Sequence, residues 1–162
     1  MATTGYDERI AVLADRAEIG DLILEFARCI DDSDQAGYAA TFDEQCELIL
    51  PFARVVGRAA IEAMPSPQPG MRTHHQISNI LFDIDGDSAR TRAYLTATHV
   101  FDATRPTDTA QAGGWYLHEL VRTAAGWRFR RVELVIVWET AEPMIRDAAH
   151  PAPAHLLNGE IL

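Results

Sequence analysis

The side chains in this sequence best suited to exchange protons near neutral pH are Asp31, His75 and His99. A carboxylate beside an imidazole can hold, accept and return a proton, which is the chemistry of general acid–base catalysis. The sequence contains no glycine-rich phosphate loop and no G-x-S-x-G nucleophile motif. Two histidines and an aspartate could in principle hold a metal, but their spacing matches no common metal motif. The sequence therefore predicts acid–base chemistry without a metal or another cofactor.

Asp31 stands at the end of an amphipathic segment. From Asp7 to Ile30 apolar residues recur every three or four positions, which predicts a long helix with one apolar stripe. At roughly 100° per residue, Asp31 falls at the edge of that stripe and Asp32 falls outside it. Burial and the negative end of the helix dipole would both raise the pKa of a carboxyl group there and favour a proton acceptor. The alternative is that Asp31 only caps the following turn.

The two histidines are placed by the alternation of side chains along predicted strands. Between Ala89 and Phe101, His99 shares the apolar face, so we expect it to point inward. In the preceding strand His75 shares a face with Asn79 while His74 points the other way, and the pattern leaves either face open for His75. An inward histidine can also be an ordinary core residue whose hydrogen bonds are satisfied.

A pocket in such a fold would be lined mainly by apolar and aromatic residues from the same faces. The walls that the sequence offers are Phe26, Leu95, Phe101, Ile136 and Trp138. Alternation does not decide the direction of Tyr116, which could line the pocket with its hydroxyl group or belong to the core or a dimer contact. Asn79, on the face of His75, is a further candidate for binding the substrate.

The predicted elements begin with helices and continue with strands. Helices are expected for Asp7 to Ile30, Gln35 to Phe42 and Arg58 to Met64. Strands are expected for Glu47 to Leu50, Arg54 to Gly57, Arg72 to Ile84, Ala89 to Phe101, Trp115 to Arg122 and Trp127 to Trp138. The Asp85-Gly86 pair between two strand segments is a good hairpin signal. This order predicts an α+β fold whose antiparallel sheet curls over its own helices.

The overall composition fits one globular domain. The chain has 162 residues, 48% of them hydrophobic, and a formal net charge of −10. An acidic chain argues against a nucleic-acid partner, because phosphate binding needs clustered Lys and Arg. Cys29 and Cys46 lack the close spacing of a metal or redox motif, so we expect buried, reduced thiols. Because no signal peptide and no apolar run of roughly 20 residues is present, we expect a soluble, cytoplasmic protein with no membrane partner.

Several segments carry a recognisable pattern when taken together. They are Ile19 to Asp31, Val56 to Ile61, Thr73 to Asn79, Asp83 to Asp87, and Gly126 to Phe129 with Arg131 and Trp138. Together they resemble the SnoaL-like, scytalone dehydratase-like branch of the nuclear-transport-factor-2-like superfamily. The resemblance implies a cone-shaped barrel, in which a curved antiparallel sheet wraps around N-terminal helices, and a homodimer formed through the outer sheet face. It implies one domain over residues 1–142 and leaves a tail, residues 143–162, of unknown role.

The resemblance also implies roles for single residues. By motif position Asp31 resembles the helix Asp of the family's dehydratases, His75 resembles their strand His, and His99 resembles a second, assisting His. These roles imply a cofactor-independent lyase or isomerase, of the dehydratase or cyclase type, acting on an apolar polyketide- or steroid-like small molecule. Family members often carry Tyr five residues before the Asp, where this sequence has Phe26. The phenols that could replace that group are Tyr38, Tyr94 and Tyr116.

Two other functions are compatible with the same fold, because a fold does not fix a function. A non-catalytic module that binds a small molecule or assembles with partners would need no proton exchange, and Phe26 is compatible with such a role. An epoxide hydrolase of this fold activates water with an Asp–Arg–Asp set, of which the sequence supports only Asp31. A hydrogen bond between His75 and Asp31 would favour the acid–base enzyme over both.

Overall fold

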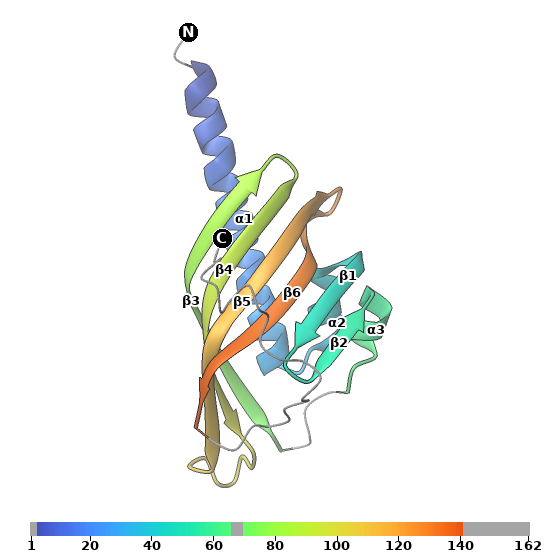
Figure 1. Ribbon diagram of the computed structural model, residues 1–162, viewed down its shortest axis with the longest axis vertical. Coiled ribbons are helices and arrows are strands. Elements are labelled where there is room, and N and C mark those ends of the chain that lie inside the picture. The colour runs from blue at the N-terminus through green and yellow to red at the C-terminus, as the bar shows by residue number, and fades with distance from the viewer. Residues whose placement is uncertain (1–2, 66–69, 141–162) are drawn as a thin grey trace.

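The computed structural model describes residues 3–65 and 70–140, which form three helices and six strands (Figure 1). The helices are α1 (Thr3–Asp31), α2 (Gln35–Ala40) and α3 (Arg58–Glu62). The strands are β1 (Phe42–Leu50), β2 (Ala53–Val56), β3 (Arg72–Asp85), β4 (Ser88–Val100), β5 (Thr109–Thr123) and β6 (Gly126–Glu139). The predicted tail, residues 143–162, lies outside the described residues.

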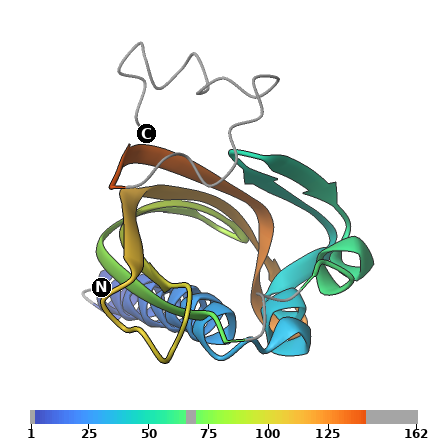
Figure 2. The same ribbon diagram turned by 90° about the horizontal axis from the view of Figure 1, so that it is seen from below.

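All six strands belong to one sheet, in the order β2-β1-β6-β5-β4-β3. Neighbouring strands are antiparallel except for the pair β1–β6, which is parallel. The sheet curves around α1, while α2 and α3 lie beside β1 and β2 (Figure 2). The predicted α+β fold, a curved and mainly antiparallel sheet around N-terminal helices, is confirmed. The sheet is nevertheless open, because β2 and β3 are its two edge strands rather than neighbours.

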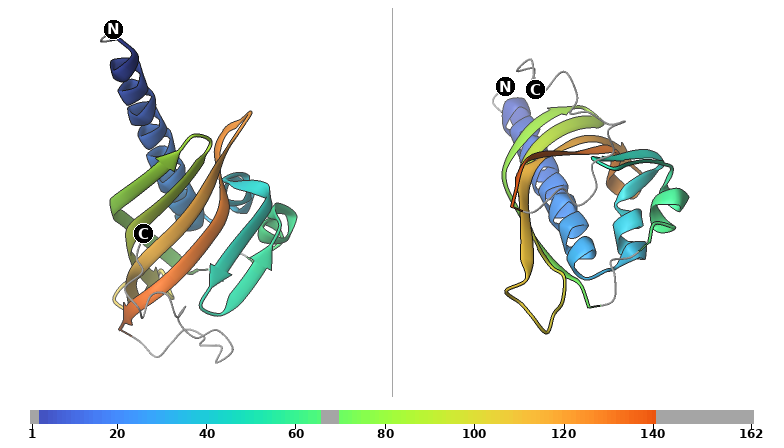
Figure 3. Two further views of the ribbon diagram at one scale, coloured as in Figure 1. Left: turned by 45° about the horizontal axis from the view of Figure 1, so that its top comes forward. Right: turned by 60° about the horizontal axis from the view of Figure 1, so that its bottom comes forward.

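The C-terminal half of α1 is the part of the helix that packs against the sheet. The largest fully buried apolar side chains from the helix and the sheet are Ile19, Ile23, Phe26, Cys29, Phe42, Cys46, Leu48, Trp127, Phe129 and Val132. Removing these apolar groups from water is the main force that holds the helix in place. The N-terminal half of α1 projects beyond the sheet (Figures 1 and 3), so Val12 and Leu13 of the predicted stripe are exposed.

Several boundaries differ from those predicted, and two of the differences have a clear physical cause. Helix α2 ends at Ala40 rather than at Phe42, because Phe42 is fully buried at the start of β1. Strand β5 begins at Thr109 rather than at Trp115, since residues 109–114 pair along β4 despite their small side chains. Pairing with a neighbouring strand overrides weak intrinsic strand propensity there.

A β-bulge in β3 changes the face of Asn79. Asn79 and Ile80 together oppose Ala93 of β4, and Asn79 has a positive φ of 49°. A bulge adds one residue and shifts the alternation of all side chains beyond it. Ile80 therefore packs toward the core, whereas Asn79 is exposed. This corrects the expectation that Asn79 shares the face of His75.

A second bulge, in β6, changes the face of Trp138. The pairs Gly114–Ile136 and Gly113–Trp138 are consecutive on β5, so Val137 is an extra residue on β6. Trp138 therefore lies on the outer face with Gly113, where a Cβ on that glycine would overlap the indole ring. Its side chain is 45% exposed. The sequence alternation, which places Trp138 inward beside Ile136, fails at this bulge.

Within residues 3–65 and 70–140, no helix is both long enough and apolar enough to cross a bilayer.

Candidate active site

Asp31, the last residue of α1, is bound to β3 by three hydrogen bonds. Its Oδ2 accepts the backbone N–H of His75 at 2.9 Å, and its Oδ1 accepts the hydroxyl of Thr73 at 2.9 Å. The ring atom Nδ1 of His75 lies 2.6 Å from Oδ1. The His75 side chain is only 7% exposed and that of Asp31 is 24% exposed. The structure thus brings together the two residues that the sequence motif suggested as an acid–base pair.

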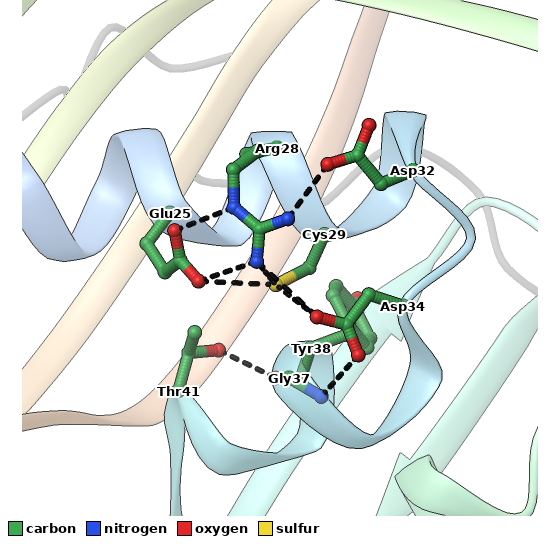
Figure 4. A network of polar contacts seen from close by, with 8 residues as sticks. All are labelled: Glu25, Arg28, Cys29, Asp32, Asp34, Gly37, Tyr38 and Thr41. Atoms are coloured by element: carbon green, nitrogen blue, oxygen red, sulfur yellow. Dashed lines mark hydrogen bonds and ion pairs between the residues drawn. The ribbon is translucent and has the colours of Figure 1, made fainter.

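A network of polar contacts holds the corner between α1 and α2, which follows Asp31 in the chain (Figure 4). Arg28, one turn earlier on α1, bonds Glu25, Asp32 and Asp34 through its guanidinium group. Asp34 in turn caps α2, because its Oδ1 accepts the backbone N–H of Gly37 at 2.9 Å. These contacts hold both sides of the turn that follows Asp31. Arg28 therefore acts on the position of the helix end, and among the described residues its guanidinium group bonds Glu25, Cys29, Asp32 and Asp34 rather than Asp31.

The pKa of Asp31 is lowered, contrary to the raised pKa that the sequence predicted. Burial opposes the charged form, but the hydrogen bonds from the backbone and ring of His75, with that from Thr73, outweigh it. An ionised carboxylate only accepts hydrogen bonds, so Nδ1 of His75 must donate to Asp31. In the neutral imidazole, Nε2 then carries the free lone pair. The pair is therefore arranged to use Nε2 of His75 as a base.

His99 lies beside this pair, on the neighbouring strand β4. Its ring centroid is 6.0 Å from that of His75, and the two rings are nearly perpendicular at 82°. Burial lowers the pKa of His99, and the nearby His75 lowers it further, while Asp31 acts in the opposite direction. His99 is therefore a neutral imidazole at neutral pH, able to donate one hydrogen bond and accept another.

Phe26 and Tyr116, two of the predicted substrate contacts, lie in the aromatic core between α1 and the sheet. The two rings meet edge-to-face with centroids 5.3 Å apart, and Phe26 also contacts Tyr38 at 5.0 Å. Both tyrosines are buried, so two phenols flank the phenylalanine. Tyr94, the third phenol considered, is on the outer face, where its ring packs against Trp115.

The other predicted substrate contacts are not gathered at the Asp31–His75 pair. Phe101 lies beyond the end of β4 and is 43% exposed. Asn79 and Trp138 are turned to other faces by the two bulges. Strand alternation is a local rule, so it cannot report the end of a strand or an extra residue within it.

Two polar features escaped the sequence reasoning. The first is Thr73, whose hydroxyl group donates to Asp31. It could have been predicted, because Thr73 lies two residues before His75 and therefore on the same face of β3. His118 is buried in the core, where Nδ1 lies 2.8 Å from the Thr91 hydroxyl and the ring stacks on Phe129. Its strand had mixed faces, so the alternation gave no signal.

Ligand sites away from the Asp31–His75 pair would need a metal-binding cluster or a groove. Within the described ranges, no group of three or more His, Cys, Asp or Glu side chains is arranged to hold a metal ion. A groove of about 450 Å³ lies between α1 and the β5–β6 turn. Its lining includes Glu18, Asp21 and Trp127, and does not include Asp31, His75 or His99. This groove is therefore separate from the acid–base pair.

Comparison with known proteins agrees with the fold and the family motifs. An uncharacterized protein of Mycobacterium tuberculosis is 28% identical over 137 residues, which cover 76% of this chain and 87% of that protein. A crystal structure from Novosphingobium aromaticivorans, named "Putative Scytalone Dehydratase", is 25% identical with a TM-score of 0.74 and covers 83% of this chain and 91% of its own.

A second structure from the same bacterium, an NTF2-like protein with a cystatin-like fold, is 25% identical with a TM-score of 0.68. It covers 91% of this chain and 94% of its own. The family model described as the SnoaL-like domain matches residues 11–133. A match of this extent includes every strand from β1 to β5 and most of α1. The chain belongs to the SnoaL-like domain family.

Proposed function

We propose that the protein is a cofactor-independent lyase or isomerase, of the dehydratase or cyclase type, that works by acid–base catalysis at Asp31 and His75. The observation that carries the proposal is the 2.6 Å hydrogen bond between His75 Nδ1 and the Asp31 carboxylate, in which the ionised carboxylate is the acceptor. Three donors keep that carboxylate ionised, and the carboxylate keeps the proton on Nδ1. A histidine held in one tautomer at a buried site is suited to general base catalysis.

The reaction begins at a carbon next to a carbonyl group. His75 Nε2 takes a proton from that carbon, the C–H electron pair forms an enolate, and negative charge collects on the carbonyl oxygen. In a dehydration the enolate then forms a new C=C bond and expels a β-hydroxyl group, which takes the proton from His75 and leaves as water. In an isomerisation the proton returns to a different carbon. His99, whose ring centroid lies 6.0 Å from that of His75, is the neighbouring group proposed to bond the leaving hydroxyl.

The surroundings of the pair favour a neutral, apolar substrate. The sequence contains no lysine. No arginine occurs at the strand positions that share the inner face around the pair. These positions are Thr73, His75, Ile77, Ala93, Leu95, Ala97, His99, Ala110, Ala112, Gly114, Tyr116, Leu134, Ile136 and Glu139. A substrate with a carboxylate or phosphate would find no cation there and would be repelled by Asp31. A polyketide- or steroid-like ketone fits these surroundings.

Likeness to known proteins supports the proposal at the level of reaction class. The Novosphingobium aromaticivorans structure named "Putative Scytalone Dehydratase", a name that describes elimination of water, is 25% identical to this chain in sequence. Scytalone is therefore the first compound to test. The other compounds are the aldol adduct of benzaldehyde and acetone, which dehydrates to an absorbing enone, and a β,γ-unsaturated steroid ketone, which isomerises to a conjugated one.

The experiment compares the wild type with variants of the pair and of an exposed neighbour. We expect His75→Ala and Asp31→Asn to lower turnover of the converted compound by at least about a hundredfold while thermal unfolding stays cooperative. His74→Ala is the matched control, because it removes an exposed imidazole from the adjacent position and should leave turnover unchanged. Near-normal turnover by a folded His75→Ala protein would reject the acid–base assignment and favour a binding module.

A further inference from the structure

The reaction proposed for Asp31 and His75 leaves one charge without a partner. When His75 removes a proton beside a carbonyl group, negative charge develops on the carbonyl oxygen, next to the Asp31 carboxylate. Enzymes stabilise such an oxyanion with donors that point at it before the reaction begins. No arginine occupies the neighbouring strand positions on the inner face, and the sequence contains no lysine. The donor must therefore be a neutral group.

Tyr116 is a neutral donor with a hydroxyl group that no other residue uses. It lies on β5, pairs with Ala93 and Leu134, and is only 3% exposed. None of the hydrogen bonds within residues 3–65 and 70–140 engages its hydroxyl. Its ring is held from two sides, edge-on to Phe26 and stacked at 5.8 Å on His118. Among the described residues, the fully buried side-chain atoms without a partner are Arg92 Nε and His118 Nε2. The Tyr116 oxygen is not one of them, so it remains accessible to a ligand or to water.

The charge of Asp31 distinguishes Tyr116 from the neighbouring phenol, Tyr38. Burial raises the pKa of Tyr116, and the Asp31 carboxylate raises it further, which means that the phenol shares the electrostatic surroundings of the pair. Burial also raises the pKa of Tyr38, but there the additional causes are Tyr116 and Cys46. Both phenols therefore keep their protons at neutral pH. Only Tyr116 is coupled to Asp31.

We propose that Tyr116 is a further catalytic residue, whose neutral hydroxyl group donates a hydrogen bond to the substrate oxygen that becomes negative when His75 removes a proton. This inference rests on the proposed function of Asp31 and His75. No proton leaves Tyr116 in the step. The C–H bond breaks, its proton goes to His75 Nε2, its electron pair goes into the enolate, and the Tyr116 O–H bond only turns toward the enolate oxygen.

The test uses p-nitrophenol as a probe, because its oxygen resembles an enolate oxygen and its phenolate absorbs visible light. We expect the wild type to bind the probe and to increase the fraction that is ionised, with the proton on His75 and the phenolate bonded by Tyr116. Tyr116→Phe should weaken binding by about tenfold and lower the ionised fraction. Tyr38→Phe is the matched control, because it removes one buried hydroxyl from the same aromatic cluster and should change neither quantity.

His75→Ala separates this inference from the function on which it rests. If His75→Ala ionises the bound probe as the wild type does, the proposed base is wrong. If His75→Ala loses ionisation while Tyr116→Phe binds and ionises the probe normally, only the role of Tyr116 is wrong. If a folded His99→Gln variant, and not Tyr116→Phe, loses binding and ionisation of the probe, the hydrogen-bond donor is His99 and the inference is overturned. Failure of the wild type to bind p-nitrophenol at millimolar concentration would overturn it too.

Discussion

At the scale of single residues, the chemistry depends on which nitrogen of His75 carries the proton. The Asp31 carboxylate already accepts the backbone N–H of His75 and the hydroxyl of Thr73, and it takes Nδ1 of the ring as a third partner. These bonds cross from the end of α1 to β3, so they fix the imidazole relative to the helix. Such preorganisation lowers the cost of proton transfer, because the base does not have to reorient during the reaction.

The lowered pKa of Asp31 predicts how the pair contributes to stability. A carboxyl group with a pKa below its ordinary 3.8 in the folded state stabilises the fold above that value, and the contribution is lost as the pH falls through the lower pKa. Asp31→Asn has no such titration. In chemical denaturation, the stability advantage of the wild type over Asp31→Asn should be present at neutral pH and shrink below pH 3.8. If the stability difference between the wild type and Asp31→Asn grows as the pH falls, the lowered pKa of Asp31 is contradicted.

His118 predicts a second acid-dependent effect, with a different window. Burial lowers its pKa from 6.5 to about 3, so the unfolded chain takes up a proton between these values and the folded chain does not. Stability should therefore decline as the pH falls from 6.5 toward 3. His118→Phe, which keeps an aromatic ring beside Phe129, should flatten this part of the curve of unfolding free energy against pH. His74→Ala, which removes an exposed imidazole, should leave this part of the curve unchanged. If His74→Ala flattens the curve as much as His118→Phe does, the pH dependence does not come from His118.

Residue types and spacing indicated part of the site and missed the rest for local reasons. Helical periodicity placed Asp31 at the edge of the buried stripe, and alternation placed His99 inward. The sign of the Asp31 pKa shift could not be predicted, because its donors, Thr73 and His75, lie 42 and 44 positions further along the chain. Before the chain folds, nothing in the sequence near Asp31 reveals them.

At the scale of elements, the corner between α1 and α2 holds the helix end that carries Asp31. Arg28 ties the last turn of α1 to Asp32 and Asp34, and Asp34 caps α2. Gly37, in the first turn of α2, lets that helix approach Asp34 and Cys29 closely, since a Cβ there would overlap both side chains. The close approach of two helices at this corner therefore depends on a missing side chain.

Gly37→Ala tests the corner, with Gly20→Ala as the matched control. Because a Cβ at Gly37 would overlap its neighbours, we expect a loss of roughly 1–3 kcal/mol of stability together with reduced turnover. A Cβ at Gly20, in the middle of α1, meets nothing within 4 Å. Gly20→Ala should therefore leave stability unchanged or raise it by up to about 1 kcal/mol, because alanine favours helix. Equal effects of the two changes in a denaturation experiment would show that the corner is not tightly packed.

Predictions of elements succeeded where a pattern repeats and failed where it is interrupted. The apolar period of α1 and the Asp85-Gly86 turn each specify an element through several residues, and both elements form. The bulges at Asn79 and Val137 each consist of one extra residue, which the alternation cannot show in advance. Their consequence is large, since every side chain beyond a bulge changes face.

At the scale of the whole molecule, the outer face of the sheet carries exposed aromatic side chains. Tyr94 on β4 and Trp138 on β6 are both exposed, and Arg92 lies over the rings of Tyr94 and Trp115. Exposed aromatic groups beside an arginine are common in protein interfaces. We propose that two copies of the chain associate through this face, as the family resemblance implies.

Analytical ultracentrifugation of charged variants tests this association. Tyr94→Glu places a carboxylate in the proposed contact, so we expect it to shift the wild-type dimer to monomer at micromolar concentration without loss of thermal stability of the fold. Leu13→Glu is the control, because Leu13 is also exposed but lies on the projecting half of α1. Dissociation by Leu13→Glu and not by Tyr94→Glu would place the contact on the helix, and a monomeric wild type would reject the proposal.

The most direct test of the acid–base pair is the protonation state of the His75 ring, measured by nitrogen-15 NMR on protein labelled at histidine. The contact between Nδ1 and the ionised Asp31 carboxylate predicts that neutral His75 carries its proton on Nδ1 and has a bare Nε2. Asp31→Asn should abolish this strict preference. A neutral His75 with its proton on Nε2 in the wild type would contradict the proposed base, whatever the substrate is.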